Sequence, residues 1–398
     1  MKMKVFVHSL NSCGMRNTDV KRYRDFLTAN GHELTNSPED SDVVLLWTCA
    51  FRGDMRDNSL AQIKQYKKNY KAELVVAGCL PDIDKKMLNE RFKGHIINWR
   101  NDEKKMEDFF GAPNKKISEI PRVLFKGKLY DDELTFRRKN RDADVPYIGR
   151  YIQIYVSEGC PFECTCCSER LTFPPYRSFS EDEIVETCRR QVEHCEKKAI
   201  VLLADSVGSY GSDTCSSLPT LINKIKDIHP DLRIAMQGFN PFYFLKFYDE
   251  IVEFLRSGLI VHLQIPYQSA SDRILKLMKR PYNRADIEKV FSSINEIGFT
   301  EFDTHIIAGF PGETEEEFEE TVQFALRHRP KYVLLNGFME TPDMATKLLA
   351  GKVSPETIHS RLKEAEIRLK DVGILCNCDN SVLSKERFKR MNKYEQIR

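Results

Sequence analysis

Three cysteines in one short stretch are the strongest sign of chemistry in this 398-residue chain. Cys160, Cys164 and Cys167 stand in SEGCPFECTCCSER with the spacing C-x3-C-x2-C. Three thiolates on a four-iron, four-sulfur cluster leave one iron without a protein ligand, where another molecule can bind. Structural zinc is a weaker alternative, because it needs four ligands and the nearest further thiol, Cys166, is adjacent to Cys167. The spacing therefore predicts a cluster with an open iron, with Cys166 as a packed neighbour.

A second set of three cysteines is dispersed over the N-terminal part of the chain. Cys13, Cys49 and Cys79 each follow an apolar stretch that is typical of a buried β-strand. These three strands are expected at residues 4–9, 42–48 and 73–78. Helices are expected after them at residues 18–30, 57–70 and 81–91, and a fourth strand and helix at residues 96–99 and 103–110.

This alternation predicts an α/β domain over residues 1–112, with a Rossmann- or flavodoxin-like parallel sheet. The carboxyl ends of parallel strands share one edge, where ligands bind, so Cys13, Cys49 and Cys79 are expected to lie close together. We interpret them as ligands of a second four-iron cluster with an open iron, the auxiliary cluster. The alternative is that they are small buried side chains without a metal.

A second run of strands and helices begins after a linker. Residues 113–149 are rich in proline and charge, with a short strand expected near residues 123–125 and a basic run, FRRKNR, that we interpret as solvated. Strands are then expected at residues 151–156, 199–204, 232–237, 259–264, 302–308 and 332–336. Helices are expected between them at residues 180–196, 216–229, 243–257, 285–297 and 313–328.

These units over residues 150–372 predict a partial (β/α)6 TIM-like barrel, whose active site lies at the carboxyl ends of its strands. The Cys160 triplet follows the first of these strands and is therefore expected at that mouth. Polar residues and glycines after other strands are expected to line the same opening. They are Asp205, Gln237, Gln264, Gln268, Gly309 and Gly312.

The composition excludes some classes of function. Lysine and arginine number 61 against 59 acidic residues, so the net charge of +2 gives no global attraction to nucleic acid or membrane. The start, MKMKVFVHSL, has too short an apolar run for a signal peptide, and no stretch reaches the roughly eighteen apolar residues of a membrane span. We expect a cytoplasmic location, where the twelve cysteines are metal ligands or buried thiols and not disulfides.

With these residues in place, the chain resembles the radical SAM enzymes, and the dispersed cysteines make it similar to the radical SAM methylthiotransferases. The resemblance covers roughly residues 3–372 and rests on stretches such as LVVAGCLP, SEGCPFECTCC, HLQIPYQSASDRILKLMKR and THIIAGFPGETEEEF. It implies two 4Fe-4S clusters, and S-adenosyl-L-methionine used both as radical source and as methyl donor. The radical cluster would be held by Cys160, Cys164 and Cys167, and the auxiliary cluster by Cys13, Cys49 and Cys79.

The resemblance also implies cofactor contacts and a redox partner. By position, Asp205, Gln237, Gln268 and Arg280 are expected to contact S-adenosyl-L-methionine, with Gly309 and Phe310 beside its adenine. No catalytic side chain beyond the cluster ligands is implied. An external electron donor such as flavodoxin or ferredoxin is expected to supply the reducing electron.

This sequence departs from the family pattern at several positions. Cys166 stands where family members usually carry an aromatic residue, and Trp47 stands where they carry asparagine. Family members usually end in a small substrate-gripping β-barrel, the TRAM domain, whereas only about 25 residues follow Gly373 here. We expect residues 373–398 to form a short basic tail without that domain.

The expected activity is insertion of a methylthio group at an unactivated C–H bond of a peptide or protein side chain, with the aspartate β-carbon favoured. A transfer RNA adenosine methylthiotransferase is the alternative, since the basic tail could hold phosphates. A second alternative is a radical SAM methyltransferase or epimerase in which the auxiliary cluster only relays electrons.

Overall fold

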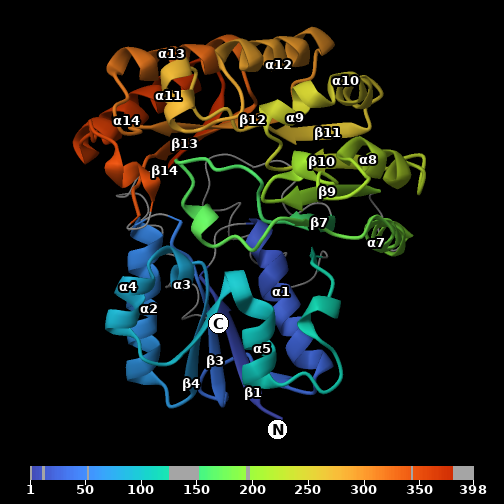
Figure 1. Ribbon diagram of the computed structural model, residues 1–398, viewed down its shortest axis with the longest axis vertical. Coiled ribbons are helices and arrows are strands. Elements are labelled where there is room, and N and C mark those ends of the chain that lie inside the picture. The colour runs from blue at the N-terminus through green and yellow to red at the C-terminus, as the bar shows by residue number, and fades with distance from the viewer. Residues whose placement is uncertain are drawn as a thin grey trace. The chain divides into compact units, whose positions relative to one another are not determined.

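The structure is a computed structural model, and it describes residues 2–10, 14–51, 53–124, 152–193, 198–341 and 344–379. The chain divides into two compact units (Figure 1). The first contains Met1–Leu124, Cys167–Pro174 and Met339–Lys347, and the second contains the remaining residues. None of the described helices combines the length and apolar character needed to cross a membrane.

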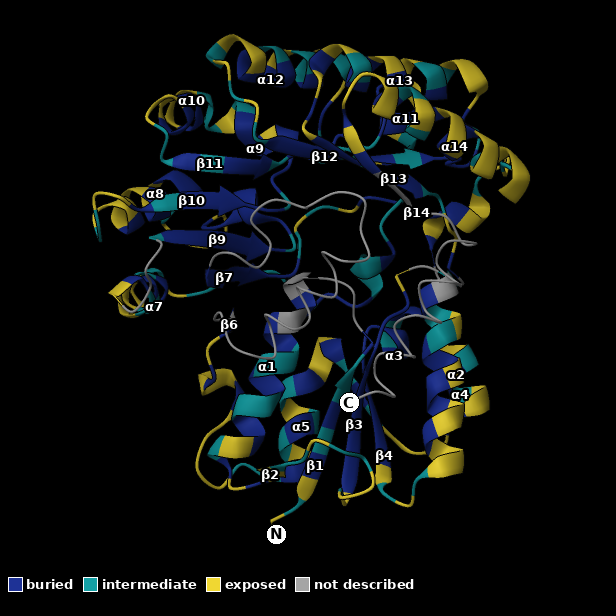
Figure 2. Cartoon of the chain, turned by 180° about the vertical axis from the view of Figure 1, so that it is seen from behind, coloured by how far each residue is buried: buried dark blue, intermediate teal, exposed yellow. Residues whose placement is uncertain are grey.

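The first unit is built on a parallel sheet with the strand order β2-β1-β3-β4-β5. All six residues of its central strand β3 are buried, as expected for a parallel strand covered on both faces. Helices α1 and α5 cover one face, and α2, α3 and α4 the other (Figure 2). The strands are β1 Lys4–Ser9, β2 Glu33–Leu34, β3 Val43–Thr48, β4 Glu73–Gly78 and β5 His95–Asn98. The helices are α1 Gly14–Ala29, α2 Gly53–Asn69, α3 Leu80–Ile83, α4 Lys85–Arg91 and α5 Asp102–Phe110.

The predicted N-terminal domain is therefore confirmed in its class, with two local differences. The two-residue edge strand β2 was not predicted, because so short a segment leaves no periodic pattern. The helix expected over residues 81–91 is broken at Asp84, whose backbone is not helical and whose side chain instead accepts a hydrogen bond from the Met87 amide at 3.3 Å. The short strand expected near residues 123–125 is present as β6, Val123–Leu124.

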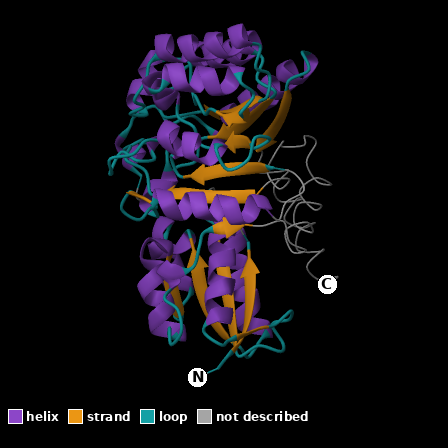
Figure 3. Ribbon diagram, turned by 90° about the vertical axis from the view of Figure 1, so that its right-hand side faces the viewer, coloured by secondary structure: helices purple, strands orange, loops and turns teal. Residues whose placement is uncertain are grey.

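The second unit contains a partial barrel of parallel strands in the order β7-β9-β10-β11-β12-β13-β14, with β8 antiparallel to β7. Every residue of β7 and of β9 is buried. Figure 3 distinguishes the strands from the helices by colour. The strands are β7 Ile152–Glu158, β8 Arg177–Ser178, β9 Ala199–Ala204, β10 Arg233–Met236, β11 Ile260–Gln264, β12 Phe302–Ala308, β13 Tyr332–Gly337 and β14 Leu375–Asp379.

The helices of the second unit are amphipathic and bury one face each; α10, for example, buries Ile251, Val252, Phe254 and Leu255. They are α7 Glu181–Glu193, α8 Leu218–Lys226, α9 Pro241–Lys246, α10 Tyr248–Arg256, α11 Asp272–Leu277, α12 Arg284–Ile297, α13 Glu315–His328 and α14 Pro355–Asp371. The helix expected over residues 243–257 is split at Phe247, and α11 and α14 were not predicted.

The barrel sheet continues further than the six expected strands. Strand β14 lies parallel to β13 in the register Tyr332↔Leu375 to Asn336↔Asp379, within the residues that we expected to begin a tail. Its buried residue Cys376 belongs to the sequence LCNCD, whose one aliphatic residue, Leu375, is exposed, so the strand carries little of the apolar signal of an inner strand. The rest of the expected tail and most of the linker lie outside the described residues.

Candidate metal centres

The cysteine loop of the second unit begins where β7 ends. Gly159 has a φ of +72°, which turns the chain out of the strand, and its amide donates a hydrogen bond to Asp205 Oδ2 at 2.9 Å. Asp205 follows the neighbouring strand β9, so its carboxylate lies directly behind the first cysteine of the triplet. Burial raises the pKa of the Cys160 thiol to about 11, although the charge of Arg280 opposes that shift. A metal-bound thiol is deprotonated, so an iron bound here would supply the charge that stabilises the thiolate.

The middle of the loop is fixed to the end of helix α11. The Thr165 amide donates to the Met278 carbonyl at 3.0 Å, and the Thr165 hydroxyl donates to the Leu277 carbonyl at 2.7 Å. Arg280 Nη1 donates to Cys164 Sγ at 3.3 Å, and Cys164 is only 5% exposed. The segment after α11 therefore holds both the main chain of the loop and the sulfur of its second cysteine.

Cys166 takes the packed position that we expected for it. It packs against the buried cluster of Ile274, Met278 and Phe310. Cys167 lies at the start of the short 3-10 helix Ser168–Leu171 and is partly exposed. Cys166 therefore packs against hydrophobic side chains, in contrast to the three cysteines that have the spacing of cluster ligands.

Gln268 carries two signs of a binding role. It is a non-glycine residue with a φ of +67°, which is uncommon and is held here by bonds from its amide to the His305 carbonyl and from the Ile307 amide to its own carbonyl, at 2.9 and 3.0 Å. Its side-chain Oε1 is buried and has no hydrogen-bond partner in the described part of the chain. A buried acceptor without a donor fits a ligand that brings an N–H group, such as the amino group of S-adenosyl-L-methionine.

Two other predicted mouth residues are fixed at neighbouring strand ends. Gln237 follows β10, is 5% exposed, and donates its amide to the Leu202 carbonyl at 3.2 Å. Gln264 ends β11, and its side-chain Oε1 accepts a hydrogen bond from the Gly238 amide at 3.2 Å. The structure therefore places Gln237, Gln264 and Asp205 at carboxyl ends of adjacent barrel strands, as the topology predicted.

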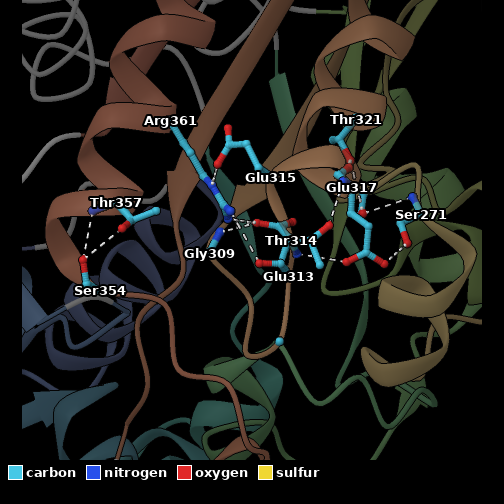
Figure 4. A network of polar contacts seen from close by, with 12 residues as sticks. Ser271, Gly309, Glu313, Thr314, Glu315, Glu317, Thr321, Ser354, Thr357 and Arg361 are labelled. Atoms are coloured by element: carbon cyan, nitrogen blue, oxygen red, sulfur yellow. Dashed lines mark hydrogen bonds and ion pairs between the residues drawn. The ribbon is translucent and has the colours of Figure 1, made fainter.

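The loop after β12, which contains GFPGE, is organised by a buried ion pair (Figure 4). The Gly309 amide donates to Glu313 Oε2 at 2.6 Å, and Arg361 Nη1 from helix α14 donates to the same oxygen at 3.1 Å. Burial raises the pKa of Glu313 to about 7, against the opposing effects of the Gly309 amide and Arg361. A Cβ at Gly309 would lie 2.2 Å from Ile358 Cγ1, so glycine lets α14 approach this loop.

Phe310, which we expected beside the adenine of the cofactor, has a side chain that belongs to the core of the barrel. Its side chain is completely buried and meets Phe338 edge to face, with ring centroids 5.1 Å apart. The ring therefore offers no exposed face to an adenine, and only the main chain of this residue is left for such a contact.

In the first unit, two of the dispersed cysteines lie at adjacent strand ends. Thr48 of β3 is paired with Gly78 of β4, and the next residues in the chain are Cys49 and Cys79. The Cys79 amide donates to the Thr48 carbonyl at 3.0 Å. Because neighbouring strands are spaced about 4.8 Å apart, this register brings the two cysteine main chains close together. Cys13 lies outside the described residues, although the Leu10 amide still bonds the Trp47 carbonyl at 2.9 Å along the same edge.

Gly78 and Ser59 fix the main chain beside the two cysteines. Gly78 has a φ of +93°, and a Cβ there would lie 2.3 Å from the Thr48 carbonyl oxygen. The Ser59 hydroxyl accepts a hydrogen bond from the Cys49 amide at 3.1 Å and donates one to the Cys49 carbonyl at 2.7 Å. Both cysteines are 5% exposed, in a setting where a metal would be shielded from water.

The donor sets fit iron-sulfur clusters better than a single ion. Within the described residues no three metal-binding side chains are grouped around one ion site. The thiolates of a cluster each bind a different iron, so such a site does not require three donors around one point. Arg280 beside Cys164 also supplies the positive charge that a buried thiolate needs.

The comparisons with known proteins agree with this fold and these sites. Residues 154–325 match the model of the radical SAM superfamily, and residues 4–97 match that of uncharacterized protein family UPF0004. Among solved structures, the radical S-adenosylmethionine methyltransferase TsrM from Kitasatospora setae has a TM-score of 0.61 at 12% identity, over 87% of this chain and 77% of that one. That likeness concerns the fold. The fold and the triplet define a radical SAM enzyme.

Relatives with sequence similarity along most of the chain specify the family. A probable threonylcarbamoyladenosine tRNA methylthiotransferase of Pyrococcus horikoshii is 27% identical over 85% of this chain and 78% of its own length. The ribosomal protein uS12 methylthiotransferase RimO of Thermotoga petrophila is 29% identical over 88% of this chain and 80% of its own. The threonylcarbamoyladenosine tRNA methylthiotransferase of Drosophila melanogaster is 30% identical over 85% of this chain and 60% of its own. These relatives and the two family models support a radical SAM methylthiotransferase, a transferase that uses S-adenosyl-L-methionine and 4Fe-4S clusters.

Two features of the sites were missed at the level of sequence. Arg280 has a cysteine partner that was not predicted, and the two residues are 116 positions apart. The Glu313–Arg361 pair spans 48 positions, and Arg361 lies on a helix that was not predicted. Neither pairing leaves a local pattern, although the position of Glu313 within GFPGE was a signal that could have been followed.

Proposed function

We propose that Cys160, Cys164 and Cys167 hold the radical cluster and that Cys13, Cys49 and Cys79 hold the auxiliary cluster. The register Thr48↔Gly78, which aligns Cys49 with Cys79, is the observation that supports the second set most directly. When bound, the clusters and S-adenosyl-L-methionine supply a deoxyadenosyl radical that abstracts an unactivated hydrogen, and a sulfur that is methylated and transferred.

The residues of the chain orient and shield these groups. Gln268 offers a buried acceptor to the amino group of S-adenosyl-L-methionine, and Asp205 fixes the turn from which the cysteine loop starts. Gln237 and the main chain of Gly309 complete the proposed cofactor contacts, the latter held in place by Glu313. Cys164 is buried, and such surroundings exclude water that would otherwise allow side reactions of a radical.

We propose a peptide or protein side chain as the substrate, with the β-carbon of aspartate favoured. The observation that carries this choice is the charge beside the cysteine loop. Arg177 is paired with Glu158 at 2.8 Å, and Lys279 lies 3.9 Å from Glu163. Nucleic-acid affinity depends on cations that neutralise phosphates, and these two cations already face carboxylates. The ribosomal protein uS12 enzymes among the relatives modify a protein.

A transfer RNA substrate is the second candidate, because several relatives are named as threonylcarbamoyladenosine tRNA methylthiotransferases. The two substrates are separated by mass spectrometry after reaction with flavodoxin or ferredoxin as electron donor. A methylthio mass increase on protein or peptide from the source cells, with unmodified transfer RNA, supports the first proposal. The same increase on a transfer RNA adenosine overturns it. A product that gains a methyl group without sulfur would instead indicate a methyltransferase.

A further inference from the structure

Arg280 has a position that the proposed function does not use. Its Nη1 donates to the sulfur of Cys164 at 3.3 Å, and the cysteine is 5% exposed. The sulfur is one of the ligands proposed for the radical cluster, so a role for Arg280 at this sulfur rests on the proposed function. A cation that bonds a ligand sulfur acts on the cluster itself, which differs from binding the cofactor.

The guanidinium group is held in its orientation by two further hydrogen bonds. Nε donates to the Tyr282 hydroxyl at 2.7 Å, and Nη2 donates to the Pro266 carbonyl at 3.4 Å. The Tyr282 hydroxyl in turn lies 3.1 Å from the Pro266 carbonyl and 3.2 Å from the Tyr267 carbonyl, to which it can donate. Because the guanidinium donors form a rigid planar fork, fixing two edges fixes the direction of the third.

The sulfur and its donor are attached to the same support. The Arg280 amide bonds the Leu275 carbonyl of helix α11 at 2.9 Å. Thr165, next to Cys164, bonds the carbonyls of Leu277 and Met278 at the end of that helix. The main chain of Arg280 and the loop that carries Cys164 are therefore both attached to one short segment, the end of helix α11.

This geometry has a direct electrochemical consequence. Reduction adds a negative charge to a cluster, and hydrogen bonds to its sulfurs together with nearby charge set its potential. A partly buried cation acts through a lower effective dielectric constant than one in water, and a charge-assisted hydrogen bond is stronger than a neutral one. Arginine also stays protonated throughout the physiological pH range. A fixed arginine on the ligand sulfur must favour the reduced cluster.

We propose that Arg280, oriented by Tyr282, is a positioning residue that raises the reduction potential of the radical cluster through Cys164. The neighbouring Lys279 provides a matched comparison. It is the preceding residue in the chain and carries the same charge, but its side chain is 61% exposed and lies 3.9 Å from Glu163. Water and salt screen such a cation, so it should leave the potential unchanged.

The test is a redox titration of the reconstituted full-length chain, monitored by electron paramagnetic resonance. The signal of the radical cluster is the one that persists when Cys13, Cys49 and Cys79 are replaced by alanine. In Arg280→Gln we expect the equilibrium constant for reduction to fall about tenfold, which lowers a one-electron potential by about 59 mV. Tyr282→Phe should lower the potential less, and Lys279→Gln should not change it.

The outcomes separate this proposal from the proposed function. A wild-type chain that assembles no cluster on the Cys160 triplet contradicts the proposed function itself. If the wild-type chain carries its clusters and Arg280→Gln leaves the midpoint unchanged, the role of Arg280 in setting the potential is overturned, and weaker binding of S-adenosyl-L-methionine would make it a cofactor contact. If Arg280→Gln fails to assemble, Tyr282→Phe decides: a lowered midpoint supports the proposal, and an unchanged one overturns it.

Discussion

The two proposed cluster sites are assembled in different ways. Cys160, Cys164 and Cys167 lie on one loop after β7, so their proximity follows from the chain itself. Cys49 and Cys79 follow separate strands, and they are brought together only because β3 and β4 pair in the register Thr48↔Gly78. A loop site tolerates small changes in the sheet around it. A site made of strand ends depends on the register, so defects in the first sheet should affect the auxiliary cluster more than comparable defects in the barrel affect the radical cluster.

The largest effect is expected from removing each cysteine set in turn. With Cys160, Cys164 and Cys167 replaced by alanine, formation of deoxyadenosine under dithionite should be lost. With Cys13, Cys49 and Cys79 replaced, it should continue while methylthio transfer stops. Iron analysis should give about eight atoms per reconstituted wild-type chain and about four for either variant. An auxiliary triple variant that keeps all its iron would refute the dispersed site.

The next largest effect is expected at Gly78, where the strand-end site is tightest. In Gly78→Ala, a side chain at φ +93° would meet the Thr48 carbonyl, which must shift and disturb the register behind Cys49 and Cys79. We expect the unfolding free energy to fall by about 3 kcal/mol. We also expect iron to be lost from the auxiliary cluster before it is lost from the radical cluster. Urea denaturation and iron content measure both. Gly31→Ala is the control, because its φ of +85° carries the same backbone strain and a Cβ there meets nothing within 4 Å.

A pH effect is expected on the barrel side. The pKa of Glu313 rises on folding from its ordinary 4.5 to about 7, so between these pH values the folded chain holds a proton that the unfolded chain has released. The contribution to stability is full below pH 4.5 and declines as the pH rises to 7, by up to about 3 kcal/mol. Glu313→Gln should flatten this slope in urea denaturation. Glu315→Gln, whose exposed carboxylate binds the same Arg361, should keep it.

The smallest effects are expected from removing one hydrogen bond at each of the two cysteine sites. Ser59→Ala removes the hydroxyl that bonds both the amide and the carbonyl of Cys49, and Thr165→Val removes the bond from the radical loop to Leu277. Each should cost about 1 kcal/mol in stability. Chelator challenge of the reconstituted chains should release auxiliary iron faster in Ser59→Ala, and should leave radical iron nearly unchanged in Thr165→Val. Equal release from both variants would show that the loop site is no more robust than the strand-end site.

Strong periodic segments were predictable because they are local. The four long strands of the first unit and the six predicted strands of the second are present, since runs of buried apolar residues identify them directly. The elements that were missed have weaker patterns. Helix α11 is only six residues long, and β14 carries asparagine and cysteine in place of aliphatic residues.

The sequence by itself determined the cysteine spacing on the radical loop, the alternation that predicts two parallel sheets, and the family. Only the tertiary structure decided which distant side chains are paired around the proposed sites. Arg280 bonds Cys164, and Arg361 bonds Glu313, because folding of the barrel brings distant segments together. The reason is physical: periodicity and turn chemistry act over a few residues, whereas a hydrogen bond between distant residues depends on how whole strands and helices pack.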